Sequence, residues 1–360
     1  MKITKVEAVP LVIPYTFGGP AHRISKLDFC LVRVETDAGL VGWGDAFAYN
    51  CRSAVAAAVN DMIAPLAVGC DAGQSATDIA ALGMMVQKQL HIFGRFGIQA
   101  YALSGLDIAL WDIAGKAAGE PLHRLLGSAT RKSIPCYASL LRYGEPALIT
   151  KYFEGALGEG YTAIKLHEVA DAAVAAGRSA VPDALPLMLD VNCEWGPDDA
   201  VLAAKRFKPH RLQWLEEPAF PPEDFEALRA AGDAGAMPIA AGENLCFETQ
   251  FQALFDAGAV TYAQPSVIKV GGITEFLKVV TLAGKYRVRI APHSPYFGPG
   301  ALATLHLLAS RVPEARFEHF YLRAEAMLYP GLFGKPHLTA PDGPGLGRDP
   351  DAEVLRRYRV

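Results

Sequence analysis

The order of apolar and polar residues in the first third of the chain predicts strands followed by helices. Residues 2–13 and 27–47 are rich in the β-branched and aromatic residues typical of strands, and Asp37-Ala38-Gly39 interrupts the second stretch as a hairpin turn would. Apolar residues at helical spacing then predict helices over about 51–65, 74–92 and 98–118. We therefore expect residues 1–127 to form an α+β domain.

The pattern changes after about residue 127. Short apolar runs now alternate with stretches of helical periodicity, which gives eight strands and seven intervening helices. The strand-like runs are IPCYAS, YTAIKLH, LPLMLDVN, LQWLEEP, MPIAAGE, VTYAQPSV, VRIAPHS and ARFEHF. Such alternation forms a parallel sheet, and eight repeats predict a closed barrel. No clean helix follows Glu318, so residues 128–322 are expected to form a (β/α)7β modified TIM barrel of the α/β class. The Gly- and Pro-rich residues 323–360 are expected to return to the first domain.

Composition excludes several classes of partner. A net charge of −4 argues against nucleic acid, and the apolar runs fall short of the roughly 18 residues that a membrane span needs. The first residues, MKITKVEAVPLVIPY, lack the apolar centre of a signal peptide. The six cysteines are scattered without a C-x-x-C pair, which is typical of reduced thiols. We expect a cytoplasmic protein that acts on small molecules.

Three acidic residues recur at nearly even intervals, each just past a strand-like run. Asp190, Glu216 and Glu243 are 26 and 27 residues apart, about the length of one strand and one helix. Successive strands of a barrel end at one face, so the three carboxylates would converge there. Carboxylates share a small volume only around a cation, and oxygen ligands suit Mg²⁺, so we predict one Mg²⁺ per subunit. The alternative is that each acid is a solvated strand-end residue.

Other ionisable residues end the neighbouring predicted strands. Lys165 and His167 are two residues apart on one strand, so both point to the same side and either could act as a base. His293 ends the seventh strand and is a candidate second acid or base. Glu318, on the eighth, would hydrogen bond a substrate carboxylate if crowding by negative groups raised its pKa. The structural alternatives are that Lys165 is only an ion-pair partner of the acids and that His167 and His293 are only packed or hydrogen-bonded.

The chain resembles the enolase superfamily, mandelate racemase subgroup, over essentially its whole length. The motifs that carry the resemblance are VRVETDAGLVGWGDAF, LSGLDIALWDIAGKAAGEPLHRLLG, LDVN, WLEEP, GEN, KVGG and the histidine of the seventh strand, in that order. The resemblance implies a capping domain over the (β/α)7β barrel and a homo-oligomer. By this resemblance, the three metal-ligand positions of the family fall on Asp190, Glu216 and Glu243, and its acid/base histidine falls on His293. The acid that contacts the substrate carboxylate falls on Glu318, and the first lysine of Lys-x-Lys falls on Lys165.

Two positions depart from the family pattern. His167 stands where the second lysine of Lys-x-Lys is expected. Ser266 stands where an aspartate usually pairs with the strand-seven histidine, and where related epimerases carry a catalytic lysine. Ser266 therefore argues against the two-lysine epimerase and cycloisomerase pattern. Without a carboxylate partner to raise its pKa, His293 serves more easily as an acid than as a base.

Substrate contacts in such folds come from the capping domain. The segment PYTFGGPAHRI offers Tyr15, His22 and Arg23, of which Arg23 has the planar fork that suits a carboxylate or hydroxyls. Asn192, which closes the LDVN motif, is assigned to substrate binding with them. The alternative for Arg23 is a solvated loop arginine.

These residues favour Mg²⁺-dependent removal of the α-proton of a carboxylate substrate through an enediolate. Dehydration of a sugar acid or related hydroxy acid to a 2-keto-3-deoxy acid is the first hypothesis, and a racemase or epimerase using the same groups is the alternative. A Schiff-base aldolase using Lys165 or Lys269 and a metal-binding protein without turnover stay open. Gly271-Gly272 after Lys269 fits part of a phosphate loop or a tightly packed turn equally well.

Overall fold

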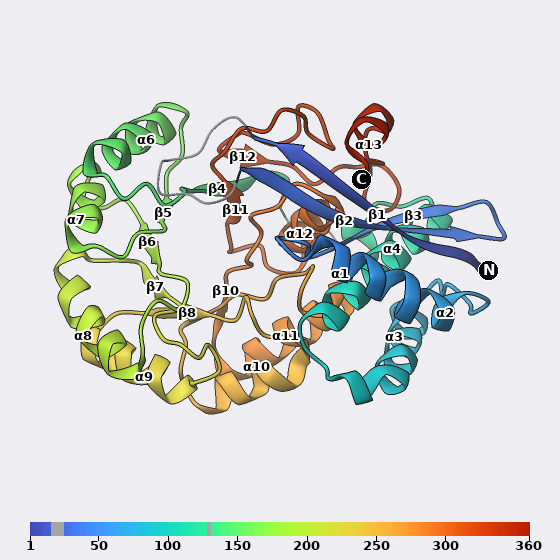
Figure 1. The fold of residues 1–360 in the computed structure, drawn as a ribbon, viewed down its shortest axis with the longest axis horizontal. Helices are drawn as coiled ribbons and strands as arrows, with labels where there is room; N and C mark the ends of the chain where they lie inside the picture. Colours follow the sequence, from blue (N-terminus) through green and yellow to red (C-terminus); the bar gives the residue numbers. More distant parts are fainter. Residues whose placement is uncertain (16–24, 128–130) are drawn as a thin grey trace.

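Two bodies of secondary structure lie side by side, an antiparallel sheet with its helices and a circle of parallel strands with helices outside it (Figure 1). The structure, a computed structural model, describes residues 1–15, 25–127 and 131–360. Among these residues, no helix is both long and apolar enough to cross a membrane. The predicted fold class, an α/β barrel with an α+β capping domain, is confirmed.

The capping domain begins with a three-stranded antiparallel sheet of β1 (Ile3–Pro14), β2 (Lys26–Thr36) and β3 (Val41–Ala46). Its helices are α1 (Arg52–Ala57), a π-helical turn (Ala58–Ile63), α2 (Ala64–Ala67), α3 (Ala76–Leu90), a 3-10 turn (His91–Phe93), α4 (Ile98–Ala118) and α5 (Leu122–Leu125). Helix α4 is apolar around its circumference and almost entirely buried, as such a helix must be. It packs against β3 so closely that a Cβ on Gly44 would lie 1.8 Å from the carbonyl oxygen of Gly105.

Eight parallel strands alternate with seven helices in the barrel, as the sequence predicted. The strands are β4 (Ile134–Ser139), β5 (Ile164–Leu166), β6 (Leu187–Asp190), β7 (Trp214–Glu216), β8 (Ile239–Ala241), β9 (Tyr262–Ala263), β10 (Arg289–Ile290) and β11 (Phe317–Phe320). The helices are α6 (Pro146–Gly158), α7 (Asp171–Ser179), α8 (Pro197–Phe207), α9 (Phe225–Gly235), α10 (Phe247–Asp256), α11 (Gly272–Tyr286) and α12 (Pro299–Ser310), and a 3-10 turn (Lys208–His210) follows α8. The strand order is β10-β9-β8-β7-β6-β5-β4-β11. Between β10 and β11, Ser294 N donates to Glu318 Oε2 (3.2 Å) and Glu318 N donates to Ser294 Oγ (3.0 Å).

The strands present two successive tiers of side chains to the barrel interior. The lower tier, which we call the floor, is an apolar cluster of Tyr137, Ala163, Met188, Trp214, Ala240 and Ala291 with Tyr262 packed against it. Side chains alternate along a strand, so the residue two positions further on points inward again. The positions two residues further on are Ser139, Lys165, Asp190, Glu216, Gly242, Gln264 and His293. We call these residues, together with Glu318, the upper tier. The upper tier lies at the carboxyl ends of the strands, where barrel enzymes carry their active sites.

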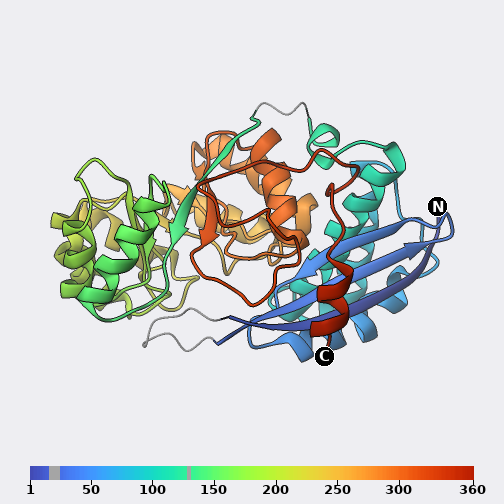
Figure 2. The ribbon, with the colours of Figure 1, turned by 90° about the horizontal axis from the view of Figure 1, so that it is seen from above.

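The last residues of the chain lie against both bodies. Strand β12 (His337–Leu338) pairs with β4 of the barrel, whereas α13 (Ala352–Tyr358) lies along β1 (Figure 2). Between them, Leu346 N donates to Asp112 Oδ1 of α4 (2.8 Å), and Val360 N at the end donates to Pro10 O of β1 (3.2 Å). The segment therefore ties the capping domain to the barrel.

Helix α4 also fixes the turn that leads into α11. Ser104 Oγ accepts from Gly271 N (2.9 Å), and Asp107 Oδ1 accepts from Thr274 N (3.0 Å). A Cβ on Gly272, whose φ is +91°, would lie 2.3 Å from Asp107 Oδ1, so only glycine fits there. Close packing against the capping domain explains Gly271-Gly272, and the phosphate-loop interpretation is not needed.

Candidate active site

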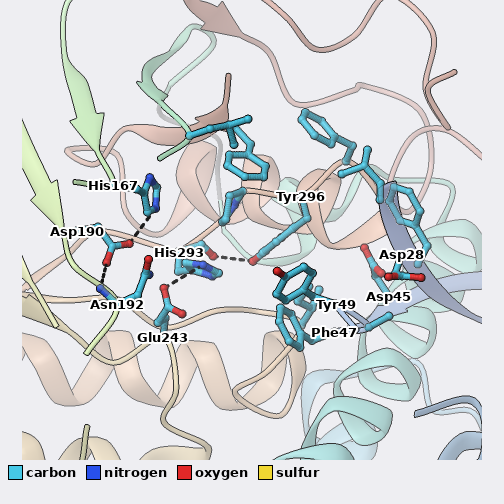
Figure 3. A pocket seen from close by; sticks show the side chains of 18 of the residues that line it. Asp28, Asp45, Phe47, Tyr49, His167, Asp190, Asn192, Glu243, His293 and Tyr296 are labelled. Atoms are coloured by element: carbon cyan, nitrogen blue, oxygen red, sulfur yellow. Dashed lines mark hydrogen bonds and ion pairs between the residues drawn. The ribbon is translucent and has the colours of Figure 1, made fainter. Parts of the chain in front are cut away.

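A cavity of about 840 Å³ lies between the upper tier of the barrel and the capping domain. His167, Asp190, Asn192, Glu243 and His293 line it from the barrel, as Figure 3 shows. The capping domain contributes the opposite wall through Lys26, Leu27, Asp28, Phe29, Asp45, Ala46, Phe47, Ala48 and Tyr49. Four of the predicted ionisable residues, His167, Asp190, Glu243 and His293, therefore face a space large enough for a small organic acid, whereas Lys165, Glu216 and Glu318 do not line it.

The three predicted metal ligands lie together. Asp190, Glu216 and Glu243 each offer a carboxylate oxygen, and these three oxygens are within 4.8 Å of one another. Asp190 and Glu216 end β6 and β7 and are level in the ladder, while Glu243 follows β8 after Gly242, whose φ is +124°. Mg²⁺ holds its oxygens at about 2.0–2.1 Å in an octahedron, so ligand oxygens are roughly 3–4 Å apart. A small contraction of the three carboxylates would give that spacing.

Lys165 sits among these acids without contact to solvent. Its Nζ is 2.7 Å from Glu216 Oε1, 2.7 Å from Glu318 Oε1 and 3.4 Å from Asp190 Oδ2. Burial lowers the pKa of Lys165, but the attraction of Glu216 and Glu318 outweighs it and holds the pKa well above its usual value. The ammonium of Lys165 is therefore held by carboxylates that come from three different strands.

His167 lies beside Asp190 at the edge of the cavity. Its Nε2 is 3.1 Å from Asp190 Oδ2, and its Nδ1 is 2.5 Å from the carbonyl oxygen of Leu140. Both imidazole nitrogens thus lie within hydrogen-bond distance of oxygen atoms. Burial raises the pKa of Asp190, but the opposing effect of Lys165 and His167 is larger and brings this pKa well below its usual range. The aspartate is ionised and ready to bind a cation.

His293 approaches the acids from β10. Its Nε2 is 3.1 Å from Glu243 Oε2, while its buried Nδ1 has no hydrogen-bond partner among the described residues. Ser266 Oγ lies 3.4 Å from the hydroxyl of Tyr296, and that hydroxyl donates to the backbone oxygen of His293 (2.7 Å). Burial lowers the pKa of His293 more than Glu243 raises it. This direction agrees with the expectation that His293 is a weak base.

Glu318 is held by hydrogen bonds on both of its oxygens. Oε1 accepts from Ser139 Oγ (2.8 Å) and lies against Lys165, and Oε2 accepts from Ser294 N. Burial raises the pKa of Glu318, but Lys165 and then His293 lower it below its usual value. The expected raised pKa is therefore wrong, since the nearest charge is the lysine ammonium and not another carboxylate. Glu318 accepts hydrogen bonds here and does not donate one.

The predicted substrate-binding residues have different outcomes. Asn192 lines the cavity, and its N–H donates to Asp190 Oδ1 (2.9 Å). Tyr15 follows β1 and bridges to Ala324, and the described lining of the cavity does not include it. His22 and Arg23 lie outside the described residues.

Sequence reasoning missed a chain of polar groups next to Glu243, in which Glu217 and Lys269 are buried and Asn244 is exposed. Asn244 Nδ2 donates to both oxygens of Glu217 (2.9 and 3.1 Å), and Asn244 Oδ1 accepts from Lys269 Nζ (2.8 Å). Lys269 Nζ is also 3.6 Å from Glu243 Oε1. Burial raises the pKa of Glu217 to about 8, with Glu243 and Asp190 adding to the effect. Glu217 therefore accepts from Asn244 and is not one of the three clustered carboxylates.

The wall of the cavity also holds polar residues that the sequence did not single out. Asp28 and Asp45 come from β2 and β3, and Arg142 follows β4. Arg142 Nε donates to His167 O (2.9 Å), and its guanidinium is 3.5 Å from Glu194. Asp45 accepts from Gly300 N, and burial raises its pKa to about 7. The alternation of β2 and β3 shows which of their residues share a face, but not that this face meets the barrel.

Known proteins resemble the chain along its full length. Residues 4–127 match the mandelate racemase / muconate lactonizing enzyme N-terminal domain, and residues 150–354 match the enolase C-terminal domain-like family. A relative named 3,6-anhydro-alpha-L-galactonate cycloisomerase, from Streptomyces coelicolor, is 34% identical over 99% of this chain and 98% of its own. A D-galactonate dehydratase from Ralstonia pickettii is 31% identical over 91% of this chain and 90% of its own. The solved structure of a mandelate racemase/muconate lactonizing protein from Paracoccus denitrificans complexed with magnesium superposes with a TM-score of 0.88 at 25% identity, covering 100% of this chain and 98% of that one.

Proposed function

Because the chain belongs to the enolase superfamily, in the mandelate racemase and muconate lactonizing enzyme family, we propose that it removes the α-proton of a sugar acid bound at a Mg²⁺ site. One observation carries the proposal: Asp190, Glu216 and Glu243 bring three carboxylate oxygens within 4.8 Å of one another beside the cavity. Hard oxygen donors with net negative charge fit Mg²⁺. When bound, the ion would polarise the substrate carboxylate and stabilise the charge that develops as the α-proton leaves.

Lys165 and His167 are proposed to take the α-proton. Both lie on β5 or just past it, on one side of Asp190. In the metal-free protein, Glu216 and Glu318 keep the Lys165 proton in place. Compensation of the charge on Asp190 and Glu216 would weaken these ion pairs, and burial would then favour the neutral amine that a base requires. Glu318, which is ionised, would position Lys165 between β5 and β11 rather than donate to the substrate.

His293 is proposed to donate a proton to the oxygen that leaves from the β-carbon. It contacts Glu243, whereas His167 contacts Asp190, as Figure 3 shows. A lowered pKa makes the protonated imidazole a stronger acid and the neutral one a weaker base. Donation to a leaving oxygen is the role we propose for His293, and with it the reaction is an elimination and not a racemisation.

The leaving oxygen decides between two net reactions. If it is a hydroxyl, water is lost and the product is a 2-keto-3-deoxy acid, which is dehydration and our first proposal. If it belongs to a ring, as in a 3,6-anhydro acid whose oxygen joins C3 to C6, the atom stays in the product and the reaction is an isomerisation. Relatives named for each reaction support both candidates. Cycloisomerisation by this route needs one base and one acid, and thus does not need a lysine at Ser266.

The test is a panel of aldonic acids, aldonolactones and 3,6-anhydro acids incubated with Mg²⁺ in D₂O and followed by NMR and mass spectrometry. Apart from the deuterium taken up from the solvent, dehydration predicts a keto acid lighter than its substrate by one water, and cycloisomerisation predicts a keto acid of unchanged composition. Deuterium at the α-carbon without a keto acid would identify a racemase or epimerase instead. Asp190→Asn and EDTA serve as controls, and keto-acid formation that survives both would contradict the metal mechanism.

Two further expectations accompany this proposal. A Schiff-base aldolase would be trapped by borohydride at Lys165 or Lys269 with a keto acid present, and we expect no adduct because both amines are ion-paired with carboxylates. The homo-oligomer implied by family resemblance stays a prediction, which light scattering of the purified protein would test.

A further inference from the structure

Gln264 directly follows β9 and belongs to the upper tier. Tyr262, two residues earlier, packs against the floor. Gln264 N donates to Ala241 O of β8 (3.0 Å), so the chain is still extended in the ladder at this point. Alternation along the strand then places the Gln264 side chain on the same interior face as Tyr262, nearer the carboxyl end. On the flanking strands, the next polar residues are Glu243 and His293.

The amide of Gln264 is fully buried and makes no hydrogen bond with the described residues. Neither Oε1 nor Nε2 has a partner. On the next strand, His293 Nδ1 is also buried without a partner. Across the barrel, by contrast, Lys165 pairs with Glu216 and Glu318, and Ser139 and Trp214 each donate to one of those acids. The unused hydrogen-bonding capacity of the upper tier is therefore concentrated on β9 and β10.

Buried polar groups in folded proteins are nearly always hydrogen-bonded, because an unpartnered one costs its full desolvation. The buried amide of Gln264 therefore lowers the stability of the folded protein unless a ligand hydrogen bonds to it. The same chain shows the structural alternative in Gln87 of α3, whose Oε1 accepts from Arg95 (2.9 Å). Gln264 has no such partner among the described residues, and its backbone pairs with Ala241, two residues before Glu243 of the carboxylate cluster.

We propose that Gln264 hydrogen bonds an oxygen ligand of the metal held by Asp190, Glu216 and Glu243. This inference rests on the proposed function, since it requires the metal. The oxygen is either a coordinated water or a carboxylate oxygen of the substrate. An amide suits this place because Nε2 donates to a carboxylate oxygen and Oε1 accepts from a water, and neither adds charge among the acids. Gln264 is thus a ligand-binding residue of the active site that does not itself transfer a proton.

The test compares Gln264→Met with the matched control Gln87→Met by calorimetry on the whole protein. Mg²⁺ is titrated alone, and oxalate, a planar dianion shaped like an enediolate, is then titrated at saturating Mg²⁺. If the partner is the substrate carboxylate, Gln264→Met weakens oxalate binding by about tenfold or more and leaves Mg²⁺ binding unchanged. If the partner is a coordinated water, Mg²⁺ binding itself weakens by a similar factor. Gln87→Met should change neither affinity.

Thermal unfolding without metal gives an independent measurement. Removing an unpartnered amide should leave the melting temperature of the metal-free protein unchanged or raise it, whereas Gln87→Met should lower it. Gln264→Leu repeats both measurements in case the methionine variant does not fold. If the Gln264 variants bind Mg²⁺ and oxalate within about twofold of wild type, the inference about Gln264 is overturned while the proposed function stands. A larger loss of metal-free stability in Gln264→Met than in Gln87→Met would overturn it in the same way. If wild-type protein binds neither Mg²⁺ nor oxalate, the proposed function fails as well.

Discussion

The floor and the upper tier of the barrel lie two residues apart on the same strands, yet they have opposite chemistry. Met188 and Trp214 belong to an apolar cluster, while Asp190 and Glu216, the next inward residues on β6 and β7, are carboxylates. Both tiers are buried to the same degree: Met188 and Glu216 are each 0% exposed. Burial therefore does not decide polarity here. The floor stabilises the barrel, and the upper tier carries charge that only pairing or a bound cation can offset.

The largest effect is expected where the upper tier loses its cation. Lys165→Met leaves Glu216 and Glu318 buried without their ammonium partner, so the metal-free protein should lose about 3–5 kcal/mol of unfolding free energy. Loss of the proposed base should also lower kcat by about 10²–10⁴-fold. Urea unfolding in EDTA and steady-state kinetics with Mg²⁺ measure the two effects. A variant that is as stable and as active as wild type would show that Lys165 has neither role.

A substitution in the floor should separate stability from function. Met188→Ala removes a fully buried side chain from the apolar cluster and should cost about 2–5 kcal/mol of unfolding free energy. Because Met188 carries no charge and contacts the floor, Mg²⁺ affinity and kcat of the folded variant should stay within about threefold of wild type. Calorimetry at a temperature where the variant is folded makes the comparison. A variant that keeps its stability but loses metal binding would erase the distinction between the tiers.

A buried carboxylate outside both tiers shows what an acid without a cation costs. Burial raises the pKa of Asp45 to about 7 from its usual value of 3.8. Since the folded-state pKa lies above the unfolded one, protonation favours the folded state, and stability is lost as pH rises from about 4 to 7. Asp45→Asn should remove this dependence, which amounts to at most about 4 kcal/mol.

Urea unfolding at pH 5 and pH 8 measures the Asp45 contribution. The unfolding free energy of wild type minus that of Asp45→Asn should be larger at pH 5 than at pH 8. Asp107, whose pKa burial also raises to about 7, is present in both proteins, so its contribution cancels. Identical pH dependence in the two proteins would mean that Asp45 is not held in a raised-pKa environment.

The sequence predicted the barrel and its acid cluster because both depend on spacing. Asp190, Glu216 and Glu243 follow strand-like runs at one strand-and-helix interval, and parallel strands bring such positions to one face. The pKa directions of Lys165 and Glu318 could not be predicted in this way. They depend on which carboxylates each group meets across the barrel, and Lys165 turned out to meet three of them.

Gln264 was missed for a different reason. The family resemblance drew attention to Ser266, two residues further along the chain, where an aspartate or a lysine is usual. Alternation from Tyr262 instead leads to Gln264 as the inward residue, and Ser266 lies near the Tyr296 hydroxyl. The pattern was present in the sequence, but the inward face of β9 became evident only when Tyr262 was seen against the floor.

The central claim is that the upper tier holds a metal ion which its carboxylates were placed to bind. Titration of wild-type protein with Mg²⁺, followed by calorimetry and by the shift in melting temperature, tests it most directly. We predict one Mg²⁺ per chain, a higher melting temperature with the ion, and loss of both in Asp190→Asn and in Glu243→Gln. Absence of binding in the wild type, or binding that both variants retain, would contradict the claim.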